Sequence, residues 1–457
     1  MTRWFGPILI ALGMLCSTCV SAQTDTGATD TGAPTQPGPQ PAYTYPDATP
    51  SLDFLSQSIE NSSITLGIGA GFSYDSNAYS ATAASQNFWL FHVTPSIKIQ
   101  QFRPKLSWNL SYAPGYQQYY NAQSVGSGNS NNNLFSQRAS AGFLWQLARR
   151  WQLAGSDSFS YSANPFDSFL TTPGTPTMNN PNPVTYFPLT QYTLNNALLT
   201  LTDQLTKVDT LSFSGTENLR RTSTYNLLTV PFYNMISYGG RAAYSHRLSP
   251  RISLGAGYDY NSLDFGKGQQ RSGTQTITVT GDYMIRPNMT ISGWVGPEYT
   301  STKTTVGIPV LGQIVYFTTH DSLWSTAVGA TFAWRDLRNS IQASVSQGIS
   351  DGGGIVGTSK VDTVTGSYRR MFTSKMDLTL NARYFHDVST TISSRLFNNY
   401  SLGAALNYKL AKSLSASAQY MFLHQTQSNT ILLGPNSYNA NIVGVTVNYT
   451  WNHPLGR

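Results

Sequence analysis

Charged side chains are scarce in this sequence. Asp, Glu, Lys and Arg together make up 11% of its 457 residues, whereas a typical soluble domain has about 25%. A water-facing surface normally carries many Lys and Glu side chains, because these keep a protein in solution. Strands built from this sequence would have too few charges to cover them in water, which disfavours a secreted soluble β-adhesin.

Cysteine is nearly absent, and its two copies lie close to the N-terminus, at Cys16 and Cys19. Residues 1–22 have the features of a secretory signal peptide: a positive charge at Arg3, an apolar run, and a small-residue cleavage sequence that ends at Ala22. Cleavage there would leave a mature chain without cysteine, which excludes a disulfide framework and a cysteine metal site.

Long hydrophobic runs are missing after the signal peptide. No stretch approaches the ~18 consecutive apolar residues that a transmembrane helix requires. Residues 23–60 are rich in Thr, Gly, Pro and Gln, which predicts a disordered periplasmic leader. The rest of the chain, residues 61–457, is expected to form the folded domain.

Catalytic motifs are absent as well. The sequence has no G-x-S-x-G and no H-E-x-x-H, so neither a serine hydrolase elbow nor a zinc protease site is predicted. His386 stands next to Asp387 near a strand end. A rim histidine beside a solvated carboxylate is the simpler interpretation, and the catalytic His–Asp pair of an outer-membrane enzyme is the alternative. We therefore predict that the protein is not an enzyme and needs no cofactor or metal.

The formal net charge of +7 raises the question of nucleic-acid binding. However, the Lys and Arg residues do not cluster on one patch or helix, which is the usual footprint of such binding. Many of them sit instead at short breaks between apolar segments. No nucleic-acid partner is predicted.

What the sequence does contain is a period-two alternation of apolar and polar residues. In residues 406–422, for example, Leu414, Ala416, Ala418 and Tyr420 alternate with Ser and Gln. The same alternation begins at about Ser63 and continues to about residue 451. Period two is typical of strands with one apolar and one polar face, so an all-β protein is predicted.

Two kinds of connection separate the strands, and they alternate without exception in our interpretation. About eight short breaks each carry Lys or Arg, and about nine longer connections are rich in Asn, Ser, Gly, Thr and Pro. We expect about 18 strands, within roughly 16 to 20, including strands at 251–262, 274–285, 289–300 and 319–334. Outer-membrane barrels have such short turns in the periplasm and long loops outside. The predicted fold is a closed transmembrane antiparallel up-and-down β-barrel with short periplasmic turns and long extracellular loops.

A closed barrel also meets the main requirement of the hydrocarbon, where every main-chain N–H and C=O must be paired and a free edge is not tolerated. The apolar face is then expected to contact lipid, and the Ser, Asn and Gln face to line a wet lumen. Tyr and Trp near the strand ends fit interfacial girdles. Asp157 fits badly because it shares a face with Leu153 and Phe159, so a β-bulge or an early strand end is expected there.

Seven charged residues fall at alternate positions that point inward in this register. An Arg facing lipid at the membrane midplane would cost ~2–4 kcal/mol, which supports the inward assignment. Inside a wide barrel such side chains stay hydrated and tune the preference for ions or solutes. Simple hydration of the lumen is the alternative to a dedicated selectivity ring. These lumen-lining candidates are Arg138, Arg241, Asp259, Asp282, Glu298, Asp377 and Arg383.

Residues 73–79, Ser-Tyr-Asp-Ser-Asn-Ala-Tyr, follow the first predicted strand, and residues 444–451 form the last one. With the hairpins between them, the chain from about 60 to 451 resembles the outer-membrane β-barrel porins often associated with bacterial exopolysaccharide systems. The resemblance is mainly architectural. It implies that the barrel assembly and insertion machinery recognises the terminal strand. Such barrels usually finish on an aromatic residue, whereas residues 452–457 follow Trp451 here.

Together these observations predict a bacterial outer-membrane channel for passive diffusion of small polar solutes. An exit conduit or accessory barrel for exopolysaccharide secretion is the alternative, since inward Tyr and Asn would suit stacking and hydrogen bonding with sugars. Outer-membrane lipid is the expected surrounding partner, and assembly as a homo-oligomer stays open. The longest connection, residues 162–190, is expected either to fold inward as a constriction or to form an outward flap.

Overall fold

The computed structural model describes residues 62–76, 87–120, 133–162, 191–223, 234–266, 269–310, 313–350, 358–390, 396–428 and 437–455. The predicted signal peptide at 1–22, the predicted leader at 23–60 and nearly all of the 162–190 connection lie outside the described residues. The domain boundaries and the constriction therefore stay predictions. No helix within the described ranges is long and apolar enough to cross a membrane.

Strands of 12 to 23 residues build the described fold. Each is longer than the ~9–11 residues that a tilted strand needs to cross the hydrocarbon. The strands are β1 Ser63–Asp75, β2 Phe88–Gln101, β3 Leu106–Tyr120, β4 Asn133–Gln146, β5 Trp151–Ser162, β6 Gln191–Asp203, β7 Asp209–Ser223, β8 Met235–Ser249, β9 Ile252–Phe265, β10 Gln270–Arg286, β11 Met289–Val310, β12 Gln313–Arg335, β13 Asn339–Ser350, β14 Ser359–Thr373, β15 Met376–Ser389, β16 Leu396–Lys409, β17 Leu414–Ser428 and β18 Ser437–Pro454.

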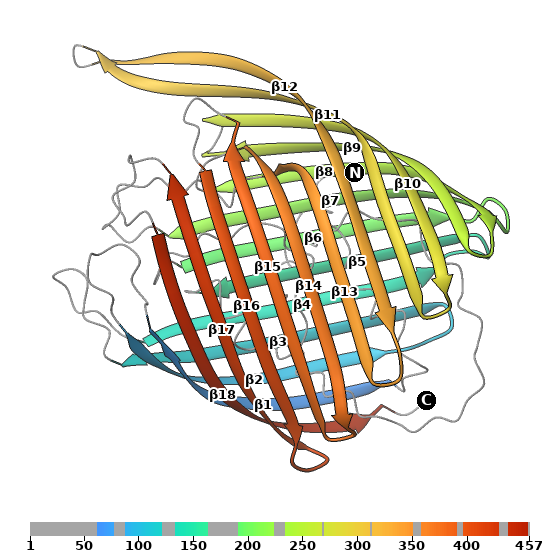
Figure 1. Cartoon of the computed structure of the whole chain (residues 1–457), viewed down its shortest axis with the longest axis vertical. Coiled ribbons are helices and arrows are strands. Elements are labelled where there is room, and N and C mark those ends of the chain that lie inside the picture. The colour runs from blue at the N-terminus through green and yellow to red at the C-terminus, as the bar shows by residue number, and fades with distance from the viewer. Residues whose placement is uncertain are drawn as a thin grey trace, which may run out of the picture.

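These strands form one closed, 18-stranded antiparallel sheet (Figure 1). Each strand pairs with its neighbours in sequence, and β1 pairs both with β2 and with β18. The closing seam is continuous from Ser63↔Pro454 to Asp75↔Ile442. The predicted closed up-and-down barrel and its strand number are therefore confirmed.

The two faces of the barrel are inverted relative to those of a soluble protein. Large apolar side chains lie exposed on the outer face, as Ile277 and Val279 do with 59% of each exposed. Thr276 and Thr278, which alternate with them along β10, are 4% and 0% exposed on the inner face. A sequence that alternates in this way has its apolar face on the outside and its polar face on the inside, as predicted.

Both ends of the described barrel, Ser63 and Pro454, lie at the end that carries the short turns. The turn between β12 and β13 shows how the sequence closes such a hairpin. The carboxylate of Asp336 accepts the main-chain N–H groups of Arg338 at 2.7 Å and of Asn339 at 3.3 Å. These bonds favour the ionised carboxylate and hold the pKa of Asp336 below its ordinary value. Local side-chain bonding of this kind is the reason that Asp favours turns.

Two connections at the opposite end are tighter than the sequence predicted. β9 and β10 pair as far as Phe265↔Gln270, and Gly266 has a φ of 59°, a conformation that glycine adopts without steric cost. β11 and β12 pair as far as Val310↔Gln313, so most of the expected loop between 300 and 319 is strand. The strict alternation of short and long connections is therefore wrong, because Thr-rich polar segments continue these strands beyond the apolar band.

The β11–β12 hairpin extends past the ends of the neighbouring strands (Figure 1, upper left). β11 and β12 pair over their whole length. In contrast, β12 pairs with β13 only from Val328↔Gln347 to Arg335↔Ser340. The outer half of β12 thus leaves the wall, and the β12–β13 seam is the shortest in the described ring.

Asp157 lies on the outer face without the predicted bulge or early strand end. Its strand pairs in unbroken register with β4 from Gln152 to Tyr161, and with β6 on its other side. The amide Nδ2 of Asn195 on β6 donates to Oδ1 of Asp157 at 2.5 Å. An amide from the neighbouring strand, and not a change of register, accommodates this carboxylate.

We predict that Gly296→Ala destabilises the barrel. A Cβ at this position would lie 1.7 Å from the main-chain oxygen of Ile277 on β10, so the backbone would have to shift. Overpacking of this kind costs about 1–3 kcal/mol. Urea unfolding of the reconstituted protein, followed by heat-modifiable migration on a gel, should show a lower midpoint than for the unmodified chain.

Gly240→Ala is the matched control, because a Cβ there meets no heavy atom within 4 Å. Its midpoint should stay close to that of the unmodified chain. Equal midpoints for the two variants would contradict the close approach of β10 and β11 at Gly296.

Candidate functional site on the inner face

All seven charged residues predicted from the sequence occupy those alternate positions of their strands that face the inside of the barrel. They come from β4, β8, β9, β10, β11 and β15. Arg138 and Glu298 are 5% and 4% exposed. The structure therefore places the seven on one face, but spreads them around the ring instead of gathering them at one point.

Three of them share a row that runs across neighbouring strands. Arg241 on β8 pairs in register with Asp259 on β9, Asp259 with Thr276 on β10, and Thr276 with Glu298 on β11. Nη1 of Arg241 lies 3.4 Å from Oδ1 of Asp259. The row thus puts one cation beside two acids on four consecutive strands.

Glu298 also holds together the seam at which β12 leaves the wall. Its Oε2 accepts the hydroxyl of Ser325 on β12 at 2.9 Å and the main-chain N–H of Ile349 on β13 at 3.1 Å. Oε1 accepts the hydroxyl of Thr276 on β10 at 3.4 Å. The pairing between β12 and β13 stops at Gln347, so the carboxylate accepts an N–H that lies beyond the ladder. A buried donor without an acceptor would destabilise the wall.

Asp282 and Arg383 mark the two ends of a second row, made of hydroxyl side chains. Oγ of Ser344 and Oγ1 of Thr365 lie 2.6 Å apart in this row. The guanidinium of Arg383 lies over the ring of Phe385, 5.0 Å from its centre, in a cation–π contact. In register order the row is Asp282, Ser292, Thr331, Ser344, Thr365 and Arg383.

Asp377, the remaining predicted acid, lies near the short turns and is bound by two neighbours. Nδ2 of Asn407 donates to its Oδ1 at 3.0 Å, and Nε of Arg369 lies 3.4 Å from the same oxygen. Asp377 therefore contributes to pairing between strands near the short-turn end.

Sequence reasoning missed five other charged residues of the described inner face: Asp75, Lys98, Arg220, Arg369 and Asp387. Asp75, Arg220 and Asp387 are 4%, 5% and 2% exposed. Asp75 and Arg220 lie just beyond the strand ends that the sequence predicted, so neither side chain was assigned to a face of the barrel. Lys98 stands between Ile97 and Ile99, and this alternation was a sufficient signal for an inward side chain.

From β2 to β11, the inner-face charges divide into two arcs of opposite sign. Lys98, Arg138, Arg220 and Arg241 lie on strands from β2 to β8, and in the described part of these strands the inner face carries no acid. The neighbouring arc, β9 to β11, carries the three acids Asp259, Asp282 and Glu298. Because low-dielectric walls focus field lines into the aqueous space that they enclose, a solute inside would experience a lateral electric field. In the described residues no three His, Cys, Asp or Glu side chains come together as a metal site.

His386 and Asp387 do not form the pair considered from the sequence. They are consecutive residues of β15, so their side chains point to opposite faces. Nδ1 of His386 lies 2.7 Å from Oδ1 of Asn398, whereas Asp387 is buried on the inner face. The catalytic His–Asp alternative is wrong for this pair.

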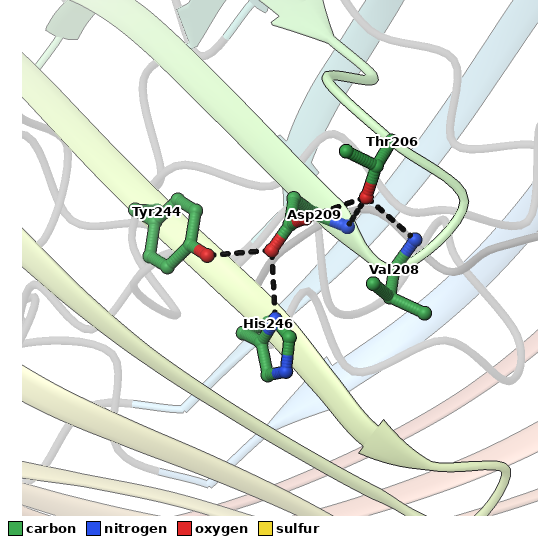
Figure 2. Close-up of polar contacts among 5 residues, drawn as sticks. All are labelled: Thr206, Val208, Asp209, Tyr244 and His246. Carbon is green, nitrogen blue, oxygen red and sulfur yellow. Dashed lines mark hydrogen bonds and ion pairs between the residues drawn. The ribbon is translucent and has the colours of Figure 1, made fainter.

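A different contact between a histidine and a carboxylate lies at the short-turn end on the outer face (Figure 2). Nδ1 of His246 lies 2.7 Å from Oδ1 of Asp209, and the hydroxyl of Tyr244 donates to the same oxygen at 2.5 Å. Oγ1 of Thr206 donates to Oδ2 of Asp209 at 2.5 Å and accepts the N–H of Val208 at 3.2 Å. The cluster ties the β6–β7 turn to β8, which is a structural task.

Where the structure describes their side chains, the tyrosines of the strands lie on the outer face, as expected for interfacial girdles, and not on the inner face that the polysaccharide alternative would use. Tyr112, Tyr258 and Tyr400 are 37%, 44% and 45% exposed, and they lie on the same outer face as the exposed Leu and Val residues. Asn side chains do occupy inner positions, as Asn407 does. The stacking argument for a polysaccharide conduit requires inward Tyr and finds no support among these described side chains.

Comparison with known proteins gives a likeness of fold only. No protein-family model matches the chain, and no curated protein matches it. The crystal structure of Acinetobacter baumannii OccAB4 is 10% identical, with 86% of this chain and 99% of that chain covered and a TM-score of 0.42. The outer membrane protein OpdK of Pseudomonas aeruginosa is 10% identical, with coverage of 85% and 99% and a TM-score of 0.39. Pseudomonas aeruginosa OccK9 is 14% identical, with coverage of 86% and 99% and a TM-score of 0.41.

We predict that Glu298→Ala loosens the β12–β13 seam. The N–H of Ile349 and the hydroxyl of Ser325 would lose their acceptor, at a cost of about 1–3 kcal/mol for a buried group left unpaired. Amide hydrogen exchange of the reconstituted protein should become faster at Ile349, with little change on the far side of the ring, in β3 to β5.

Glu298→Gln is the matched control, because the amide keeps one oxygen acceptor of the same shape. It should protect the Ile349 amide better than the Ala variant does. Unchanged exchange at Ile349 in Glu298→Ala would show that the carboxylate does not hold the seam.

Proposed function

We propose that the chain is an outer-membrane channel through which small polar solutes diffuse passively. The observation that carries this proposal is the closed ring with an apolar outer face and a polar inner face. Single barrels of 16 to 18 strands generally leave an aqueous interior. The resemblance of the sequence to outer-membrane β-barrel porins agrees with this function.

The inner face supports passage without a chemical step. Hydroxyl and amide side chains exchange hydrogen bonds with a solute at nearly the energy of its bonds to water, so neither strong binding nor full dehydration is required. Arg138 and Asp282 would line the lumen on different arcs. A solute with separated positive and negative groups would therefore be oriented across the pore.

The same proposal places the protein in its membrane. Residues 1–22 would direct export and be removed, and the barrel assembly machinery would insert the barrel. Lipid would surround the outer face. The end with short turns, where Ser63 and Pro454 lie, would face the periplasm, as it does in outer-membrane barrels generally.

Planar bilayers test the channel directly. Folded protein, identified by heat-modifiable migration, should produce stepwise conductance that grows in proportion to salt concentration, as expected for a wet pore. Folded protein that inserts without any conductance would contradict an open channel.

We also predict that the two charged arcs bias ion preference in opposite directions. Asp282→Asn removes an inner-face acid, so the ratio of cation to anion permeability should fall by about two-fold, the scale expected for one lumen charge at low salt. Arg138→Gln should raise the same ratio. The measurement is the reversal potential under a salt gradient.

Asp321→Asn is a control, since Asp321 lies on the exposed β12 extension outside the ring. It should leave the reversal potential nearly unchanged. Shifts of the same sign for Asp282→Asn and Arg138→Gln would rule out the arrangement of arcs.

A further inference from the structure

Positive charge is gathered at one end of the barrel. The chain has 28 Lys and Arg residues, and fourteen of them lie in or beside the short turns. We call these fourteen the basic rim. All eight short turns, from β2–β3 to β16–β17, contribute to it. Its members are Arg103, Lys105, Arg149, Arg150, Lys207, Arg247, Arg251, Arg286, Arg335, Arg338, Arg370, Lys375, Lys409 and Lys412.

The acids at this end do not neutralise the basic rim. The described residues include four of them, Asp203, Asp209, Asp336 and Asp377. Asp209 and Asp336 are hydrogen-bonded within their own turns, and Asp377 is bound inside the barrel. Oδ2 of Asp203 lies 3.0 Å from Nη2 of Arg150. One rim cation is thus balanced locally, and the end as a whole keeps a strong positive excess.

The opposite end of the barrel has no such excess among the described residues. There the outer-face strand ends and the β12 extension carry Arg221, Arg271, Lys303 and Lys360 together with Asp264, Asp321 and Asp362. Nε of Arg271 and Oδ2 of Asp264 form an ion pair at 2.9 Å. The asymmetry between the ends therefore belongs to the basic rim and not to the barrel in general.

Large apolar side chains stand beside the rim cations, in the same turns. A soluble surface rarely leaves such residues uncovered turn after turn. Next to a cation, they suit a boundary at which hydrocarbon meets charged headgroups, because long basic side chains there reach for phosphate while apolar neighbours stay in the hydrocarbon. They are Leu147, Leu205, Leu248, Leu337 and Leu410, exposed by 44%, 38%, 57%, 95% and 50%.

Tryptophan side chains complete this boundary on the outer face. Trp145, Trp151 and Trp451 are 45%, 37% and 46% exposed and lie at the ends of β4, β5 and β18 that adjoin the short turns. Such rings occupy the headgroup level of a bilayer. Along the barrel axis toward the short turns, an apolar band is therefore followed by a girdle of these tryptophans and then by the basic rim.

We propose that the basic rim binds the phosphate groups of anionic phospholipids in the leaflet that faces the periplasm. Cations in every short turn suit a leaflet, which surrounds the whole barrel, better than an acidic protein, which would dock on one side. The exposed Leu side chains beside the cations favour the same occupant. The inference rests on the membrane placement proposed above, but it does not require that the channel be open.

Tryptophan quenching by brominated lipid tests the proposal with the girdle as reporter. The mature barrel is reconstituted in phosphatidylcholine vesicles that contain a rising fraction of dibrominated phosphatidylglycerol or, separately, dibrominated phosphatidylcholine. We expect phosphatidylglycerol to quench with an apparent preference of about three-fold, on the scale of a few basic side chains near an anionic surface. High salt should reduce the preference, because it screens exposed charges.

The variant Arg251→Gln/Arg338→Gln/Lys412→Gln should lose about half of this preference. The matched control Arg221→Gln/Arg271→Gln/Lys303→Gln removes equal charge at the other end and should keep it. Heat-modifiable migration confirms that each variant is folded, and bilayer conductance tests the channel separately.

Equal quenching by the two brominated lipids in the unmodified protein would overturn the proposal. A preference that survives in the rim variant but disappears in the control would also overturn it. If the barrel in phosphatidylcholine bound soluble polyglutamate yet ignored phosphatidylglycerol, the basic rim would belong to an acidic protein partner and not to lipid.

Discussion

The structure depends on one constraint, the pairing of every main-chain polar group in a wall whose outer face is apolar. An unpaired N–H or C=O in hydrocarbon has no water to bond. Closing β1 on β18 from Ser63↔Pro454 to Asp75↔Ile442 removes the two edges that an open sheet would expose. Once the ring is closed, alternation sends most large apolar residues outward and most polar residues inward, and the sequence needs few charges to do so.

The same constraint explains why Glu298 is buried in the wall. β12 follows β11 into the long hairpin and separates from β13 beyond Val328. Main-chain donors of β13 beyond that point lose their ladder partner, and the Glu298 carboxylate accepts one of them, the N–H of Ile349. An inner-face charge can therefore hold the wall together. For that reason Asp282, which lies on the hydroxyl row, is the better reporter of solute selectivity than Glu298.

The sequence was sufficient for the barrel because alternation is a local property that repeats in every strand. It was not sufficient where polarity alone had to distinguish strand from loop. The Thr-rich segment after residue 300 was assigned to a loop, yet it continues β11, because beyond the membrane a hairpin needs only its partner strand and no apolar face. Asp157 shows the same limit: the amide that donates a hydrogen bond to it, that of Asn195, lies on another strand and 38 positions away in sequence.

The inner-face residues were predictable to the extent that their strands were delimited correctly. Asp75 and Arg220 were missed because the predicted strands ended too early, whereas Arg138 and Arg241 were found in mid-strand. Tyrosine was harder to assign for a different reason. Its ring and hydroxyl suit either a sugar in the lumen or the membrane interface. Only the strand face that it shares with neighbours such as Leu and Val decides between the two.

Because this chain has few charged residues, the position of each one is informative about its surroundings. A soluble protein carries charges over its whole surface, so their positions reveal little about its surroundings. Here water wets only the lumen and the two ends, and the charges follow that geometry. Those of the inner face between β2 and β11 divide into arcs of opposite sign, and half of the Lys and Arg residues encircle the short-turn end. A barrel that is symmetric in its strand pairing thus acquires two different ends. Because the leaflets of an outer membrane also differ, this charge asymmetry gives the barrel a preferred depth and direction that the β-sheet alone does not provide.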